Sequence, residues 1–107
     1  MKKRDVYIAE LPPLSGHDQH GVRPVIVIAE PVANTVLIIP CTSNIAAAQY
    51  ASTVTLKPTN TNGLREISVA LVFQLRAIDR KRLARRLGVL SSADYARIRE
   101  AIAEILE

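Results

Sequence analysis

Apolar runs separated by short polar breaks occupy the first two-thirds of the chain, and this pattern predicts a β-rich structure. Residues 5–10 form the first expected strand, with apolar side chains divided between its two faces. Residues 25–29 are apolar without alternation and mostly β-branched, which is typical of a strand covered on both faces. Pro24 biases the residue before it toward extended backbone, so we expect Arg23 at the mouth of this strand.

A second apolar, β-branched run at residues 35–39 follows a turn at residues 30–34 and is expected to stop at Pro40. The two runs predict a hairpin. If its reversal is centred near Val32, Pro24 pairs with about Pro40 and Arg23 with about Thr42. The spacing therefore predicts that Arg23 and Thr42 lie at the same open end of the sheet.

The middle of the chain is expected to add another hairpin. Residues 45–51 are rich in alanine and fit either a loop or one helical turn. Residues 52–56 alternate weakly as a strand, Asn62 and Gly63 form a strong turn signal, and residues 67–73 are expected to be the return strand.

The period changes near Asp79. Leu83 and Leu87 lie four residues apart among basic side chains, which predicts a short basic helix ended by Gly88. Ser91 or Ser92 is expected to cap a final helix with one apolar stripe, made of Tyr95, Ile98, Ile102, Ile105 and Leu106. The expected fold is mainly β with a carboxyl-terminal helix, an α+β arrangement.

The composition fits one domain, residues 1–107, with 49% hydrophobic residues. A net charge of +4 favours anionic partners but does not separate an RNA-binding protein from a merely soluble one. The single cysteine, Cys41, excludes an intramolecular disulfide and a zinc site built on paired cysteines. The chain has no signal-peptide core and no apolar run near the roughly 20 residues of a membrane span, so we expect a cytoplasmic location and no membrane partner.

The polar loop before the central strand holds most of the candidate chemistry. His17, Asp18, His20 and Cys41 are possible metal ligands, but two histidines in a loop without a second cluster are more often solvated. The glycines of the loop match no phosphate-cradling pattern. A solvated face is likewise the favoured interpretation of the basic residues 80–86.

Arg23 and Thr42, near His17 and His20, make the best constellation. An arginine stays charged and can direct two donors at a phosphate, and the Thr42 hydroxyl lies beside it together with that of Ser43. A purely structural alternative is an arginine paired with Asp18 or a carbonyl group, and a threonine that closes a turn. The residues alone favour this alternative.

Four sequence motifs, in this order, resemble the MazF/PemK (Kid-like) toxins, which are endoribonucleases of toxin-antitoxin pairs. The motifs are GHDQHGVRPVIVIA at residues 16–29, PCTSNI at residues 40–45, NGL at residues 62–64, and QLRAIDRKRL at residues 74–83 followed by LG. Each is weak alone, but the ordered set is specific and covers nearly the whole chain.

This resemblance implies an SH3-like β-barrel of the MazF/PemK/CcdB superfamily and a homodimer that an antitoxin neutralises. It also implies cleavage of single-stranded RNA without a metal or other cofactor, through attack of a 2′-hydroxyl on the neighbouring phosphate. Arg23 and Thr42 match the catalytic positions of the family, and His17 is expected to assist. The remaining matches are expected to bind RNA, namely Asp18, Gln19, His20, Ser43, Asn44, Gln74 and Arg76.

The sequence departs from the family at two places. Arg4 stands where the usual Arg-Gly-Asp opening has its glycine, which leaves the entry to the first strand uncertain. Phe73 and Leu75 replace an aspartate and a proline, so we expect altered sequence preference rather than lost activity. Two alternatives remain at this point: a gyrase-inhibiting toxin of the same fold, and a non-catalytic SH3-like binding module.

Overall fold

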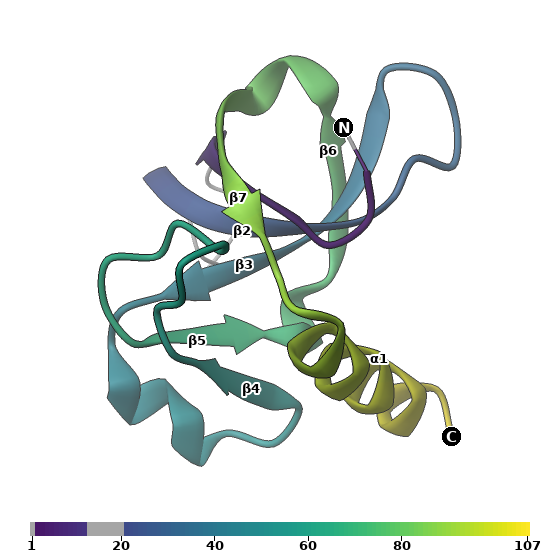
Figure 1. Ribbon diagram of the computed structural model, residues 1–107. Helices are drawn as coiled ribbons and strands as arrows, with labels where there is room; N and C mark the ends of the chain where they lie inside the picture. Colours follow the sequence, from purple (N-terminus) through teal and green to yellow (C-terminus); the bar gives the residue numbers. More distant parts are fainter. Residues whose placement is uncertain (1, 13–20) are drawn as a thin grey trace.

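The computed structural model describes residues 2–12 and 21–107 (Figure 1). In this part of the chain, seven strands and three short 3₁₀ helices precede one α-helix. None of the described helices is long and apolar enough to cross a membrane. The elements are β1 (Asp5–Leu11), β2 (Gly21–Ala29), β3 (Thr35–Thr42), η1 (Ile45–Gln49), β4 (Thr53–Leu56), β5 (Ser68–Leu71), η2 (Val72–Gln74), β6 (Arg76–Asp79), η3 (Arg80–Arg82), β7 (Leu83–Val89) and α1 (Ser92–Leu106).

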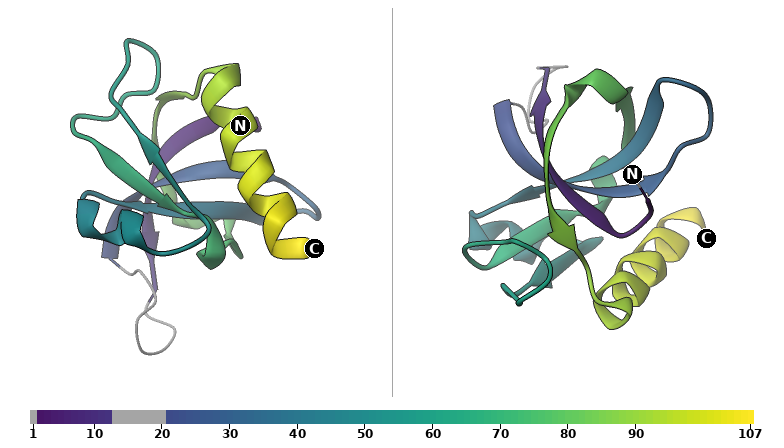
Figure 2. Two further views of the ribbon diagram at one scale, coloured as in Figure 1. Left: turned by 90° about the horizontal axis from the view of Figure 1, so that it is seen from below. Right: turned by 45° about the horizontal axis from the view of Figure 1, so that its top comes forward.

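Five strands curl into a barrel that is not fully closed. The antiparallel order runs β7, β1, β2, β3, with β6 on the far edge of β3, and η3 joins β6 to β7 across the remaining gap (Figure 2, right). The barrel strands enclose one apolar cluster, made of Ala9, Leu11, Val25, Val27, Val36, Ile38 and Ile78.

The outer face of the same sheet carries a second and larger core. Here the β4–β5 hairpin and α1 pack over the sheet, as Figure 1 shows below the barrel. Val25 and Val27 belong to the barrel cluster whereas Ile26 belongs to this second core, so β2 is covered on both faces as predicted. The buried members of the second core are Val6, Ile26, Ile39, Cys41, Val54, Leu56, Leu64, Ala70, Val72, Leu90, Tyr95, Ile98 and Ala101.

The predicted β2–β3 hairpin is present, but its register and ends differ from the expectation. Pro40 pairs with Val25 rather than with Pro24, and β2 begins at Gly21, so Arg23 is its third residue. Pro24 pairs with Ile8 of β1, at a point where the β2–β3 ladder has already ended. A proline has no N–H to donate, so it is tolerated where a strand is paired on one edge only.

Strand β3 does not stop at Pro40 but continues to Thr42. Its first half pairs with β6, up to Ile38 opposite Arg76, and its last residues pair with β5, with Thr42 opposite Val69. Pro40 therefore falls at the interruption between two partner strands, where prolines are accommodated.

The predicted basic helix after Asp79 is wrong. Only one 3₁₀ turn forms, capped by the Asp79 side chain, which accepts a hydrogen bond from the Lys81 N–H at 2.9 Å. The next residues form β7, because pairing with β1 lets Leu83 and Leu87 pack on the two cores, Leu83 on the barrel cluster and Leu87 on the outer one. The four-residue spacing of the leucines was thus misleading.

Two glycines join β7 to the β4–β5 connection. The expected β4–β5 hairpin is present, but its connection spans residues 57–67 rather than a tight turn, and its Asn62 side chain is buried and bonded to three backbone groups. An added Cβ at Gly88 would overlap the carbonyl of Thr61, and one at Gly63 would overlap the carbonyl of Leu87. Gly88, predicted as a helix terminator, is therefore required by close backbone contact.

Arg4 occupies the position of the missing family glycine in a left-handed conformation, with φ of 77°. This conformation costs about 1 kcal/mol for a residue with a side chain. The Arg4 guanidinium compensates by donating two hydrogen bonds, at 3.1 and 3.0 Å, to the carbonyl of Leu90. The entry to β1 is thus retained without glycine, and it is tied to the start of the final helix.

The final helix begins as predicted, because the Ser91 hydroxyl accepts a hydrogen bond from the Asp94 N–H at 3.1 Å. Tyr95 and Ile98 are buried, and burial raises the pKa of Tyr95 while Arg99 and Arg4 act in the opposite direction. The predicted stripe is too long, since Leu106 is 80% exposed and Ile105 is also exposed. Residues 45–51, left undecided by the sequence, form η1 and its exit.

Replacing Gly88 with alanine is expected to lower the free energy of unfolding by about 3 kcal/mol, because backbone on both sides must move. Gly21→Ala is the matched control. Gly21 also has positive φ, at 83°, but an added Cβ there meets nothing within 4 Å, so its cost is about 1 kcal/mol. Urea denaturation of both variants measures the difference. Equal losses would show that the Gly88 contact has no special weight.

Cys41 is fully buried, and burial raises the pKa of its thiol from 9.0 to about 12. The unfolded thiol ionises near pH 9 while the folded one stays protonated, so the free energy of unfolding falls as pH rises above 9 and is unaffected below it. We expect a loss of about 1.4 kcal/mol per pH unit from this group. Urea denaturation between pH 8 and 10 tests this, with Cys41→Ala as the control that lacks the extra slope.

Candidate functional site

The carboxyl end of β3 carries a locked polar turn. Thr42 is only 6% exposed, and its hydroxyl oxygen accepts a hydrogen bond from the Asn44 N–H at 3.2 Å. The Asn44 side chain in turn accepts one from the Ala46 N–H at 3.2 Å and so caps η1. Two successive side chain–backbone bonds therefore fix the direction in which the chain leaves the sheet.

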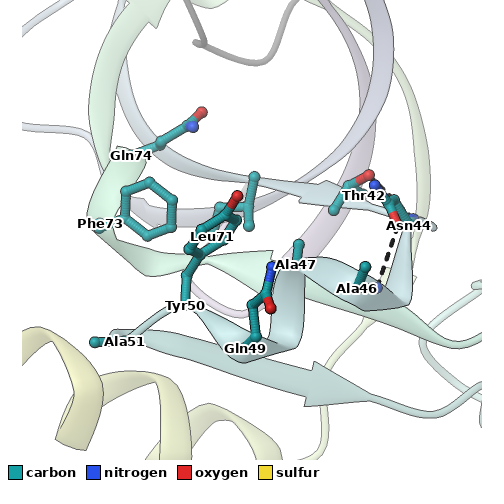
Figure 3. A pocket seen from close by; sticks show the side chains of 10 residues that line it. All are labelled: Thr42, Asn44, Ala46, Ala47, Gln49, Tyr50, Ala51, Leu71, Phe73 and Gln74. Carbon is teal, nitrogen blue, oxygen red and sulfur yellow. Dashed lines mark hydrogen bonds between the residues drawn. The ribbon is translucent and has the colours of Figure 1, made fainter.

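A pocket of about 560 Å³, here called the aromatic pocket, opens beside this turn (Figure 3). In Figure 3 the rings of Tyr50 and Phe73 lie side by side at one end, and Thr42 and Asn44 lie at the other. Its floor includes Ala47 and Leu71, which pack together with Val69 in a small cluster of their own. The full lining is Thr42, Asn44, Ala46, Ala47, Gln49, Tyr50, Ala51, Leu71, Phe73 and Gln74.

A second pocket of about 410 Å³, here called the arginine pocket, borders the other side of the β3 end. Arg23, Arg65 and Arg85 line it together with Glu66 and Ser43. Successive residues of a strand direct their side chains to opposite faces, which explains why Thr42 and Ser43 belong to different pockets. An excess of guanidinium groups makes this cavity suited to a phosphate.

The predicted site residues are divided between these two cavities. Thr42, Asn44 and Gln74 line the aromatic pocket, whereas Arg23 and Ser43 line the arginine pocket. Arg76 opens β6 opposite Ile38. The loop positions His17, Asp18, Gln19 and His20 lie outside the described residues.

Sequence reasoning missed the aromatic pair. The ring centroids of Tyr50 and Phe73 are 6.2 Å apart at 70°, and the residues are 57% and 47% exposed. Aromatic residues make up only 4% of the chain, so the meeting of two of them on the surface is informative. No spacing rule relates the two positions, because they come from two different 3₁₀ helices. Arg85 was hidden in the same way by its assignment to a helix.

The groups that line the two pockets are hydroxyls, amides, guanidinium groups and aromatic rings. Among residues 2–12 and 21–107, no group of three or more His, Cys, Asp or Glu side chains is arranged to hold a metal ion. Guanidinium groups and hydroxyls bind phosphates, while amides and aromatic rings contact bases. The combined surface therefore fits a nucleic-acid strand.

Comparison with known proteins gives both relatives and structural neighbours. The chain is 33% identical over 106 residues to "Endoribonuclease MazF" of Staphylococcus saprophyticus, covering 95% of this chain and 88% of that one. A protein of the same name from Staphylococcus epidermidis is also 33% identical, with the same coverage.

Solved MazF structures share the fold. The crystal structure of MazF from Deinococcus radiodurans has a TM-score of 0.81 at 27% identity, covering 99% of this chain and 96% of the other. A MazE-MazF structure from the same organism has a TM-score of 0.75 at 27% identity, covering 99% and 95%. The expected SH3-like barrel with a carboxyl-terminal helix is thereby confirmed. Residues 2–106 match a family model described as PemK-like, MazF-like toxin of type II toxin-antitoxin system, and the chain belongs to that family.

Proposed function

We propose that this protein is the toxin of a type II toxin-antitoxin pair and acts in the cytoplasm as a homodimeric, sequence-specific endoribonuclease on single-stranded RNA. One observation carries the proposal. The Thr42 hydroxyl and the arginine pocket with Arg23 lie on either side of the same strand end, in a chain whose relatives are named endoribonucleases. The continued β2–β3 register sets Arg23 level with Thr42, although the ladder itself ends at Val25 and Pro40.

The proposed reaction is an internal transfer that needs neither metal nor cofactor. The 2′-oxygen forms a bond to the adjacent phosphorus, and the bond from phosphorus to the 5′-oxygen breaks. The 2′-hydroxyl gives up its proton and the leaving 5′-oxygen takes one up. The products are a cyclic phosphate and a 5′-hydroxyl end, so water is not consumed in this step.

The residues divide the work according to their chemistry. Negative charge builds on the phosphorane, and the Arg23 guanidinium stabilises it and donates to the leaving oxygen. The Thr42 hydroxyl orients the phosphate or the attacking 2′-hydroxyl. His17 assists with proton transfer, since an imidazole changes charge near neutral pH. Ser43, Asn44, Gln74 and Arg76, with Asp18, Gln19 and His20 of the loop, bind RNA around this centre.

Arg23→Ala is expected to lower kcat/KM for RNA cleavage by about 10²- to 10³-fold, because a donor to the developing charge is lost. Thr42→Ala is expected to cause a similar loss, and Thr42→Ser to retain most activity because the hydroxyl stays. Cleavage of a long single-stranded RNA in EDTA is the measurement, with the cleavage sites mapped to give base preference.

Arg97→Ala is the matched control for charge, since Arg97 lies on α1 in an exposed pair with Asp94. Near wild-type cleavage by both alanine variants at positions 23 and 42 would contradict the assigned roles. A wild-type protein that cleaves no RNA in EDTA would instead favour the gyrase inhibitor or the binding module. Sedimentation of the same sample at micromolar concentration tests the homodimer, which a monomer would contradict.

The proposed antitoxin uses an acidic or amphipathic segment that occupies the basic RNA groove. The chain has a net charge of +4, and exposed basic residues continue from the arginine pocket along η3 and β7. Charge complementarity would speed association and favour such a segment. A MazE-MazF assembly is known for the relative from Deinococcus radiodurans.

The antitoxin is expected to compete with RNA for the toxin. Titration of cognate antitoxin into toxin bound to fluorescent RNA that lacks the reacting 2′-hydroxyl should release the RNA in proportion to the loss of activity. Raising salt should weaken both complexes, because exposed charges are screened. Loss of cleavage with RNA still bound would show that the antitoxin does not act by occupying the groove.

A further inference from the structure

We propose that Tyr50 and Phe73 form a stacking face for one unpaired base of the RNA next to the cleaved bond, and that they help to set its base preference. This inference rests on the proposed endoribonuclease function. It assigns a use to Phe73, which stands where the family often has an aspartate.

The two rings are available for such a contact. Tyr50 and Phe73 are 57% and 47% exposed, and their edge-to-face packing leaves ring surface that faces the aromatic pocket (Figure 3). Large exposed aromatic side chains are uneconomical on a surface unless something covers them. Every base has a π-face that can stack on such a ring.

Backbone and side-chain bonds hold the rings in place before any ligand binds. The Tyr50 N–H donates to the Ala47 carbonyl at 3.1 Å, and the Tyr50 carbonyl accepts from the Thr53 hydroxyl at 3.0 Å. The Phe73 N–H donates to the Ser52 carbonyl at 3.3 Å and so links the two segments directly. Binding a base to this face therefore costs little ordering of the protein.

The rest of the pocket supplies groups that read a base edge. Asn44, Gln49 and Gln74 contribute amides, and Thr42 contributes a hydroxyl. An amide both donates and accepts, which matches the Watson–Crick edge of an unpaired base. An aromatic face combined with polar groups for the edge is the arrangement that sequence-specific single-strand recognition requires.

These polar groups favour a base over an apolar segment of a second copy of the chain. An apolar side chain that filled the pocket would cover the rings but would leave amides without hydrogen-bond partners, which is costly. A base satisfies both. Thr42 lines the same pocket and is assigned to the reacting phosphate or 2′-hydroxyl, so the stacked base belongs to a nucleotide next to the cleaved bond.

The test uses RNA that lacks the 2′-hydroxyl at the cleavage site and carries 2-aminopurine at one position at a time around it. Stacking on an aromatic ring quenches 2-aminopurine fluorescence, so wild-type toxin is expected to quench it at one position. Phe73→Leu and Tyr50→Leu keep apolar volume but remove the π-face, and each is expected to abolish the quenching. On cleavable RNA, each is expected to raise KM about tenfold with little change in kcat.

Two further variants sharpen the result. Phe73→Trp should restore quenching and KM, which a purely structural role for Phe73 does not predict. Ile67→Ala is the matched control, because Ile67 is 43% exposed and lies outside the lining of both pockets. It is expected to leave quenching, KM and base preference unchanged.

Quenching that persists in both leucine variants, or that never occurs with wild-type toxin, would overturn the stacking role. Variants that change from dimer to monomer on sedimentation would also overturn it, by showing that a second copy covers the rings. The fluorescence measurement needs no cleavage. Absence of cleavage by the wild-type toxin would therefore count against the proposed function, while the quenching pattern still decides the stacking.

Discussion

The shared use of strand β3 by two layers is the constraint on which the rest of the structure depends. A strand has two edges, and β3 gives one to β2 and divides the other between β6 and β5. The β6 half completes the barrel, and the β5 half carries the hairpin over the outer core. Both faces of β3 are therefore buried, which is possible only because nearly all its side chains are apolar.

The division of this edge also creates the site. The chain must leave β5 and enter β6 at the split, and it does so through η2, which brings Phe73 and Gln74 to the surface. Beyond the other end of the split, Thr42 and the capped η1 bring Asn44 and Tyr50 to the same pocket. Irregular connections on a rigid sheet thus supply the polar and aromatic groups, as is common for binding sites.

Close backbone contacts decide where the sequence pattern is overridden. Leu83 and Leu87 fit a helical period, but the free edge of β1 and the contact of Gly88 with Thr61 make an extended strand the better solution. Arg4 shows the opposite case, in which a residue lacking the freedom of glycine holds a left-handed turn through two hydrogen bonds to Leu90. Local preference yields wherever a long-range contact offers more.

The sequence by itself determined the first three strands, the final helix with its Ser91 cap, the burial of Cys41 and the family motifs that single out Arg23 and Thr42. These features depend on local periodicity, capping and residue chemistry, which are readable along the chain. Only the tertiary structure decided the β3 split, the strand character of β7 and the meeting of Tyr50 with Phe73. Each of these depends on contacts between segments far apart in sequence, and no local pattern records which segments will meet.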